Sequence, residues 1–350
     1  MKIAVIGCGT IANAAHIPSY LKNPEAEIVC LCDIIKERAD KAAQRCPEGA
    51  RSVTDYHEVL NDEAVEAISV CVPNDAHARI TIDALRAGKH VLCEKPAART
   101  YAEALTMQEA QHQSGKVLNI GVVNRFNDSV NHIRRYIRSG KLGDVFHVYI
   151  SFRSHRSIPG LGGAFTTRAL AGGGALIDWG VHFLDIVMYC CGDPVPVTVT
   201  GETFCRLGRD MPAYAYTDMW AGPPNYNGTY DVEDSVTGMI RTGGPVITLN
   251  GAWAQNIGEN EMFIDFMGDK AGIRLQYGSD FTLYTAEHGA LVQYQPVFPT
   301  HDHFENEINA FIGCIRSGEK LPSHIDTVII TAKIMQALYD SSDKHREIVF

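Results

Sequence analysis

The chain lacks several features that mark particular classes of protein. Its 350 residues include 31 Lys and Arg against 41 Asp and Glu, so the basic excess of a nucleic-acid-binding protein is missing. No apolar run approaches the roughly 18 residues of a membrane span. The start, MKIAVIGCG, enters an apolar run at once and has none of the organisation of a signal peptide. We therefore expect neither a nucleic-acid nor a membrane partner, and no targeting segment.

Cysteine is present but not in patterns that bind metal. The 10 cysteines include no CxxC pair, and Cys190-Cys191 has no His/Cys cluster nearby. Five others lie in or beside apolar runs, where a free thiol behaves as a small hydrophobe. They are Cys8, Cys30, Cys32, Cys71 and Cys93. A chain of this length with 45% hydrophobic residues needs no disulfide scaffold. We expect a reduced, cytoplasmic protein without zinc.

The first third of the chain alternates between strand-like and helix-like segments. Helical patterns at 35–46, 77–88 and 101–113 separate short apolar runs at 2–7, 27–33, 67–73, 90–95 and 116–123. Such alternation predicts βαβ units and a doubly wound parallel sheet, and apolar strands are typical of sheets buried on both faces.

The turn after the first strand reads Gly7-Cys8-Gly9-Thr10-Ile11-Ala12, a G-x-G-x-x-A motif between a strand and a helix. Gly7 permits the tight turn, Gly9 lets the backbone approach a pyrophosphate, and Ala12 allows close helix packing. The motif therefore predicts a dinucleotide site, with phosphates at the helix N-terminus.

Asp33 ends the second strand-like run. A carboxylate there accepts both ribose hydroxyls of NAD and repels the 2′-phosphate of NADP. Lys36 and Arg38 lie close enough in sequence to soften this repulsion, but they fit a solvated helix face better. We predict NAD rather than NADP.

Two further stretches lie where parallel strands end, which is where open α/β sheets bind ligands. They are VPNDAH at 72–77 and CEKPAA at 93–98, and a later stretch reads GGGALIDWGVHFLD at 172–185. Together with GCGTIA and Asp33, their order and spacing resemble the glucose–fructose oxidoreductase, inositol dehydrogenase and rhizopine catabolism family (Gfo/Idh/MocA). The resemblance covers essentially the whole chain.

The resemblance implies an α/β fold with two domains. Residues 1–122 would form an NAD-binding Rossmann domain, and residues 123–350 an α+β domain with a large, open, mainly antiparallel sheet for substrate binding and oligomerisation. It also implies a cis Lys95–Pro96 bond. The cofactor contacts expected on this basis are Gly7, Gly9, Thr10, Ile11, Asp33, Pro73, Asn74, His77, Glu94, Lys95 and Asn124.

The stretch 172–185 would be a helix lining the active site. Helical spacing puts Asp178, His182 and Asp185 on one face, with an apolar stripe of Ile177, Val181, Leu184 and Met188 beside it. We expect His182 to be the general base, Lys95 to stabilise the developing alkoxide, and Asp178 to orient substrate and His182. Asp185 fits a bracing role, and a metal site is disfavoured because the family works without metal.

The family acts on sugars, polyols and their derivatives, so the reaction expected is reversible oxidation of a secondary hydroxyl, with NAD as hydride acceptor. Expected substrate contacts are Lys95, Arg125, Arg153, His155, Arg168, Asp178 and His182. The segment 208–232 is rich in tyrosine and tryptophan, and proline and glycine exclude a regular helix there. It would enclose a substrate or contact another subunit, and a bulky glycoside oxidised at C3 would suit it.

The stretch from residue 303 onward predicts two closing helices, and the exposed second sheet predicts a homodimer or homotetramer. Two other functions remain open. One is an NAD-dependent glycoside hydrolase that oxidises its substrate only transiently. The other is a non-catalytic cofactor or sugar sensor.

Overall fold

The computed structural model describes residues 1–47, 49–278 and 280–350. Within these residues the chain forms two compact units. The first combines Met1–Asn127 with His301–Ile329, and the second combines Asp128–Thr300 with Ile330–Phe350.

The first unit contains a parallel sheet of six strands in the order β3-β2-β1-β4-β5-β6. The order reverses between β1 and β4, the position where doubly wound sheets bind ligands. The strands are β1 (Lys2–Ile6), β2 (Glu27–Cys32), β3 (Arg51–Val53), β4 (Ala67–Val70), β5 (His90–Glu94) and β6 (Leu118–Gly121). All the expected strands are present, and β3 is additional.

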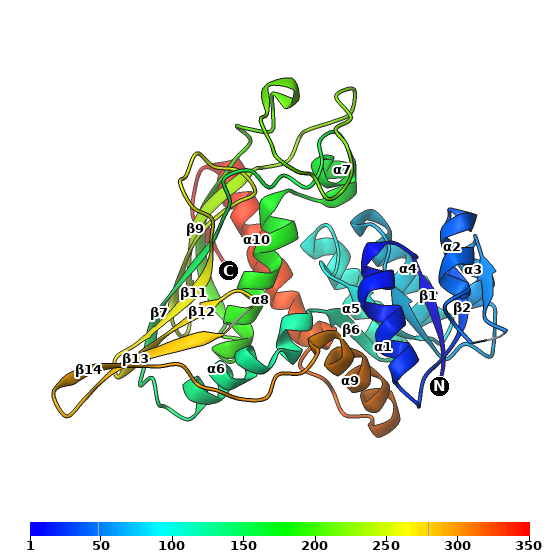
Figure 1. The fold of residues 1–350 in the computed structure, drawn as a ribbon, viewed down its shortest axis with the longest axis horizontal. Helices are drawn as coiled ribbons and strands as arrows, with labels where there is room; N and C mark the ends of the chain where they lie inside the picture. Colours follow the sequence, from blue (N-terminus) through cyan, green and yellow to red (C-terminus); the bar gives the residue numbers. More distant parts are fainter. Residues whose placement is uncertain (48, 279) are drawn as a thin grey trace. The chain divides into compact units, whose positions relative to one another are not determined.

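Helices connect these strands and complete the doubly wound arrangement (Figure 1). They are η1 (Ala12–His16), α1 (Ile17–Lys22), α2 (Lys36–Ala43), α3 (Tyr56–Leu60), α4 (Asn74–Arg86), α5 (Tyr101–Ser114), η2 (Val123–Phe126) and α9 (His303–Ser317). Ile308, Phe311 and Ile312 of α9 pack into the same core as Ile17 and Tyr20 of α1. From the sequence we expected all of 123–350 to belong to the second domain, whereas α9 belongs to the first compact unit.

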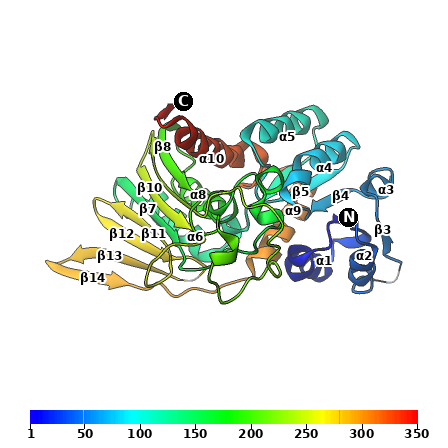
Figure 2. The ribbon, with the colours of Figure 1, turned by 90° about the horizontal axis from the view of Figure 1, so that it is seen from above.

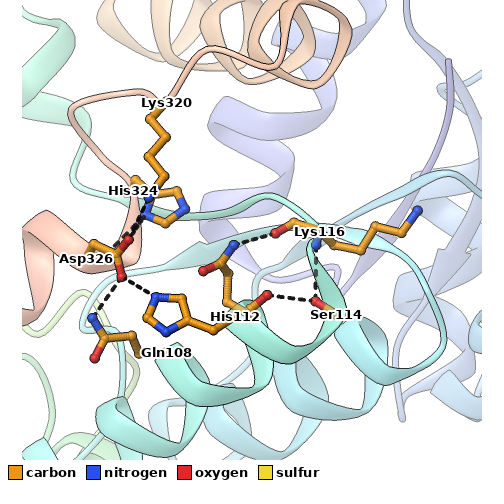
Figure 3. A network of polar contacts seen from close by, with 8 residues as sticks. Gln108, His112, Ser114, Lys116, Lys320, His324 and Asp326 are labelled. Atoms are coloured by element: carbon orange, nitrogen blue, oxygen red, sulfur yellow. Dashed lines mark hydrogen bonds and ion pairs between the residues drawn. The ribbon is translucent and has the colours of Figure 1, made fainter.

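Asp326, in the first turn of α10 (Ile325–Lys344), ties the end of this unit to α5 (Figure 3). Its carboxylate accepts hydrogen bonds from Gln108 Nε2 and His112 Nε2, both at 2.8 Å, and from Lys320 Nζ at 2.9 Å. His324 Nδ1 lies 3.3 Å away. Partial burial alone would raise the pKa of Asp326, but these donors lower it well below its ordinary value.

The second unit is built on a mixed, mostly antiparallel sheet of nine strands in the order β14-β13-β12-β11-β7-β10-β9-β8-β15, which fans out in Figure 2. Its strands are β7 (Val145–Arg153), β8 (Pro196–Phe204), β9 (Ser235–Thr242), β10 (Val246–Ala252), β11 (Glu261–Gly268), β12 (Ala271–Gln276), β13 (Phe281–Glu287), β14 (Ala290–Tyr294) and β15 (Ile348–Val349). The neighbours β7 and β10 run parallel to each other, whereas the other pairs are antiparallel.

Helices cover one face of this sheet (Figure 1). They include α6 (Asp128–Arg138), the π-helical turn η4 (Leu176–Gly180) with its continuation α8 (Val181–Cys190), and the later part of α10. Alternate residues of β7 point into this core, so Ile150 and Phe152 meet Phe183 and Leu184 of α8. The segment Arg168–Cys190 is long and apolar enough to cross a membrane, but 72% of its most apolar window is buried. We interpret it as a core helix.

Two loops form a second, smaller core in this unit. Residues 154–167 and 205–232 contribute Ile158, Leu161, Met211 and Tyr214, which pack around Trp253. Apart from the 3-10 turn η5 (Met211–Ala213), the segment 208–232 has no helix, as expected from its proline and glycine. It is therefore an ordered layer with its own apolar interior.

Candidate functional site

The glycine-rich turn has the geometry that its sequence predicts. Gly7 has φ +92°, and a Cβ there would overlap the carbonyl of Cys71 on the neighbouring strand, so only glycine fits. A Cβ at Gly9 would meet nothing within 4 Å, so the backbone is open there. Thr10 is exposed at the start of the helix and Ile11 is half-buried. An open backbone at a helix N-terminus suits a pyrophosphate.

Asp33 is fixed beside this turn. Its Oδ2 accepts from Cys8 N and its Oδ1 from Ile35 N, both at 2.8 Å. Each carboxylate oxygen keeps a further lone pair, so both can still accept a ribose hydroxyl. The turn and Asp33 together fit the ribose and pyrophosphate of a dinucleotide.

Glu94 and Lys95 follow β5, and the Lys95–Pro96 peptide bond is cis, as the resemblance implies. Glu94 Oε1 lies 2.8 Å from His16 Nε2, and its Oε2 accepts from Lys95 N at 3.0 Å. Burial would raise the pKa of Glu94, but the hydrogen bond from His16 and the nearby positive charges lower it overall. Glu94 therefore positions the backbone of Lys95, whose side chain is half-buried.

His77 has a different environment from the one expected of a cofactor contact. It is only 1% exposed, and its two ring nitrogens face the carbonyls of Pro96 (Nδ1, 2.7 Å) and Val72 (Nε2, 2.9 Å). Both partners are acceptors, so the ring joins the two stretches that follow β4 and β5. The ring therefore braces the segments that follow β4 and β5, and its expected cofactor contact stays a prediction.

Arg125 also has a partner within its own unit. It is 1% exposed, and its Nη1 donates to the carbonyl of Pro322 at 2.8 Å. It thus links η2 to the segment before α10, and its expected substrate contact stays a prediction. Its neighbour Asn124, expected to contact the cofactor, is buried in the same 3-10 turn.

The stretch 172–185 is helical, but it begins with a π turn. Asp178 lies in η4 and His182 in α8, and both are half-buried. Asp185 instead is buried and accepts from Thr331 Oγ1 of α10 at 3.4 Å. Asp178 and His182 thus keep some exposed surface, whereas Asp185 is fixed against α10. The apolar stripe from Ile177 to Met188 is buried as predicted.

The three glycines before this helix each have a structural cause. Gly172 has φ +89°, a left-handed conformation that favours glycine. A Cβ at Gly173 would overlap the Tyr339 hydroxyl, and one at Gly174 would overlap the carbonyl of Glu233. Close approach to other segments, rather than to a ligand, thus explains the last two.

Trp253, which the sequence did not indicate, holds Asp178. Its side chain is fully buried in the loop core, and its Nε1 donates to Asp178 Oδ2 at 3.2 Å. His182 lies on the same helix, with its ring centroid 6.2 Å from that of Tyr277. The loop core therefore fixes one carboxylate oxygen of Asp178.

Arg153 faces away from this helix. Phe152 points into the core with α8, so the next residue on β7 points to the opposite face of the sheet. There the guanidinium pairs with Glu261 at 2.5 Å and lies near Ser151. Arg153 therefore forms a cross-strand ion pair, and its expected substrate contact stays a prediction.

The remaining expected substrate contacts are both exposed, His155 on the loop 154–167 and Arg168 at the start of the short helix α7 (Arg168–Ala171). His155 Nδ1 lies 3.2 Å from the carbonyl of Gln255. The guanidinium of Arg168 lies over the ring of Tyr339 at 5.6 Å, and its backbone N donates to Asp231. Both side chains keep surface on which a polar ligand can bind.

Comparisons with known proteins identify the family to which both units of the chain are similar. Residues 1–122 match "Oxidoreductase family, NAD-binding Rossmann fold", and residues 130–274 match the GFO/IDH/MocA C-terminal domain. D-glucoside 3-dehydrogenase of Escherichia coli is 31% identical over 98% of this chain and 95% of its own. Inositol 2-dehydrogenase 2 of Saccharopolyspora erythraea is 28% identical over 91% and 86%. A solved complex of levoglucosan dehydrogenase with NADH and levoglucosan superposes with a TM-score of 0.84 at 21% identity, covering 100% and 99%.

Proposed function

The chain belongs to the Gfo/Idh/MocA family of NAD-binding oxidoreductases that act on sugars or polyols, and we propose that it oxidises a secondary hydroxyl of a glycoside, at C3 of the glycosyl ring. The likeness to D-glucoside 3-dehydrogenase over nearly the whole chain supports the substrate class. The observation that carries the chemistry is the helix start, where Asp178 and His182 stay half-buried on a segment that, apart from Trp179, is otherwise buried in the core.

The catalytic roles follow from the side chains. Bound NAD supplies the hydride acceptor. His182 takes the hydroxyl proton as general base, because an imidazole accepts protons near neutral pH. Lys95 donates to the same oxygen and stabilises its negative charge. Asp178, held by Trp253 through one oxygen, binds substrate hydroxyls and favours the imidazolium form of His182.

We propose NAD rather than NADP as the working cofactor. The support is Asp33, whose carboxylate is fixed by two backbone amides beside the glycine-rich turn and would oppose a 2′-phosphate. Pro73, Asn74, Glu94 and Asn124 complete the proposed cofactor environment. We further propose a cytoplasmic enzyme that forms a homodimer or homotetramer through the C-terminal sheet, because large apolar side chains such as Phe146 and Tyr284 are exposed on its strands.

The test is turnover of NAD with a panel of methyl glycosides, free hexoses and inositols, with the products identified by NMR. We expect NADH to accumulate in step with a 3-keto glycoside. Hydrolysis of the glycoside without net NADH would instead indicate transient oxidation, and binding without turnover would indicate a sensor. Oxidation of inositols alone would overturn the glycoside assignment.

Two variants test the roles at the site. Lys95→Ala should reduce kcat by about 100- to 1,000-fold and His182→Ala by about 100- to 10,000-fold, with NAD affinity nearly unchanged. His147→Ala, on the other face of the sheet, is the control and should keep wild-type turnover. A Lys95 or His182 variant that keeps more than about a tenth of the activity contradicts the role of that residue.

A further inference from the structure

Glu233 is a buried carboxylate that the proposed mechanism does not use. It lies just before β9 and is 2% exposed. Its Oε1 accepts three hydrogen bonds, from Gly174 N (2.9 Å), Leu176 N (3.0 Å) and Tyr339 OH (2.9 Å). Its own backbone carbonyl accepts Ala175 N at 3.2 Å. One residue thus receives three successive amides at the start of the helix that bears Asp178 and His182.

This arrangement replaces a local helix cap. A helix leaves its first N–H groups without intrahelical partners, and a Ser, Thr, Asp or Asn usually satisfies them from the preceding residue. The residue in that position here, Ala175, provides no side-chain hydrogen bond. Glu233 supplies the acceptor from a segment 57 residues away in sequence.

The cap acts directly on the position of Asp178. The backbone N of Asp178 donates to the carbonyl of Gly174 at 3.0 Å, and Gly174 N is held by Glu233. Gly173 and Gly174 lie so close to Tyr339 and Glu233 that neither can carry a Cβ without overlap. Glu233 and Tyr339 therefore confine the helix start together.

We propose that Glu233, together with Tyr339, is a positioning residue that fixes the helix start and thereby sets the placement of Asp178 and His182 for the reaction. The inference rests on the proposed function for its kinetic consequence but not for its structural one. Burial raises the pKa of Glu233, while the hydrogen bonds from Leu176 and Gly174 act in the opposite direction. Glu233 Oε2 is buried without a hydrogen-bond partner among the described residues. Oε1 alone therefore accepts the hydrogen bonds that the side chain makes to the helix start and to Tyr339.

That asymmetry defines the variants. In Glu233→Gln the amide oxygen can still accept all three donors, so we expect kcat within about threefold of wild type. Glu233→Leu removes the acceptor and leaves buried N–H groups unpaired. Its kcat should fall by at least about tenfold with a smaller change in KM, since misplaced catalytic groups reduce the rate more than binding. Tyr339→Phe removes one donor and should give an intermediate loss.

The matched control is Tyr189→Phe. Its hydroxyl is also a buried donor, to Asn131 Oδ1 at 2.8 Å, but it lies at the far end of α8. This variant should show the general cost of losing a tyrosine hydroxyl in this unit without affecting the helix start. Its kcat should match wild type.

Hydrogen exchange by mass spectrometry, on peptides covering 170–180, separates this inference from the proposed function. We expect faster exchange there in Glu233→Leu and Tyr339→Phe than in wild type, Glu233→Gln or Tyr189→Phe. If wild type oxidises no glycoside, the proposed function fails and exchange alone decides the positioning role. If Glu233→Leu does not fold, Tyr339→Phe decides. Unchanged exchange and kcat in a folded Tyr339→Phe, or an equal kcat loss in Tyr189→Phe, would overturn the proposal.

Discussion

The environment of His77 predicts an alkaline loss of stability that can be calculated from its contacts. Both ring nitrogens face carbonyl oxygens, at 2.7 and 2.9 Å, and a carbonyl has no proton to give. Both nitrogens must therefore donate, which only the imidazolium form can do. Burial by itself would lower the pKa of His77, but the neighbouring Cys93 and these two carbonyls raise it to about 9.

The magnitude follows from the difference between the folded and unfolded pKa. An unfolded histidine titrates near pH 6.5, so folding raises the pKa of His77 by about 2.5. This difference corresponds to a free energy of about 3 kcal/mol. Because folding raises the pKa, this contribution is complete below about pH 6.5 and is lost as the pH rises through about 9. His77 should therefore contribute about 3 kcal/mol to the stability of the first unit at pH 6 and almost nothing at pH 10.

The perturbation is His77→Gln, in which one side-chain amide replaces a doubly donating cation. Wild type and variant are compared by hydrogen exchange of the β4 and β5 amides, corrected for intrinsic rates, at several pH values. The stability difference should be greatest at pH 6 and should disappear toward pH 10. In parallel, the imidazole signal of His77 is identified in the NMR spectrum of wild type by its absence from the variant. This signal should titrate near pH 9. Titration at or below pH 6.5, or a stability difference independent of pH, would refute the reasoning.

Further predictions concern the cofactor, the link to α5 and the loop layer. Asp33→Ser should narrow the preference for NAD over NADP in calorimetry, because a carboxylate about 4 Å from a phosphate charge costs about 4 kcal/mol at an effective dielectric near 20. Folding lowers the pKa of Asp326, so its contribution is present at neutral pH and is lost in acid. Asp326→Asn should lower Tm at pH 7 and less so at pH 3. Tyr216 and Trp220 are 39% and 61% exposed. If they stack on the substrate, replacing both by Ala should raise KM up to about tenfold and leave the assembly unchanged in light scattering. Dissociation of the oligomer in this variant would indicate a subunit contact instead.

The first unit was predictable because its signals are local. Each parallel strand is an apolar run, and the glycine-rich turn lies between a strand and a helix, so composition and spacing suffice. The strand β3 was missed because its three residues, Arg51–Val53, carry no periodic pattern. The helix that bears His182 was also predictable, from the apolar stripe that packs on the sheet.

Sequence patterns could not place side chains whose position depends on partners distant in sequence. A π turn leaves the apolar stripe intact, so periodicity could not show the turn or the contact of Asp185 with Thr331 of α10. The face on which Arg153 lies depends on which side of the sheet the helices cover, and this is fixed only by tertiary packing. Glu233 had a weak signal, since two adjacent acids precede an apolar strand, but its partner Tyr339 lies more than a hundred residues further on.

The parallel pairing of β7 and β10 affects how this enzyme can change specificity. Two parallel neighbours require a crossover, and here it contains both loops of the second core, the helix that bears Asp178 and His182, β8 and β9. The chain leaves the sheet after Arg153 in β7, re-enters it at Pro196 in β8, and returns beside β7 at Val246 in β10. Its loops can therefore lengthen or be replaced while the sheet keeps its register at that point. The sheet serves as a fixed frame, and selection for new substrates can act on the inserted loops.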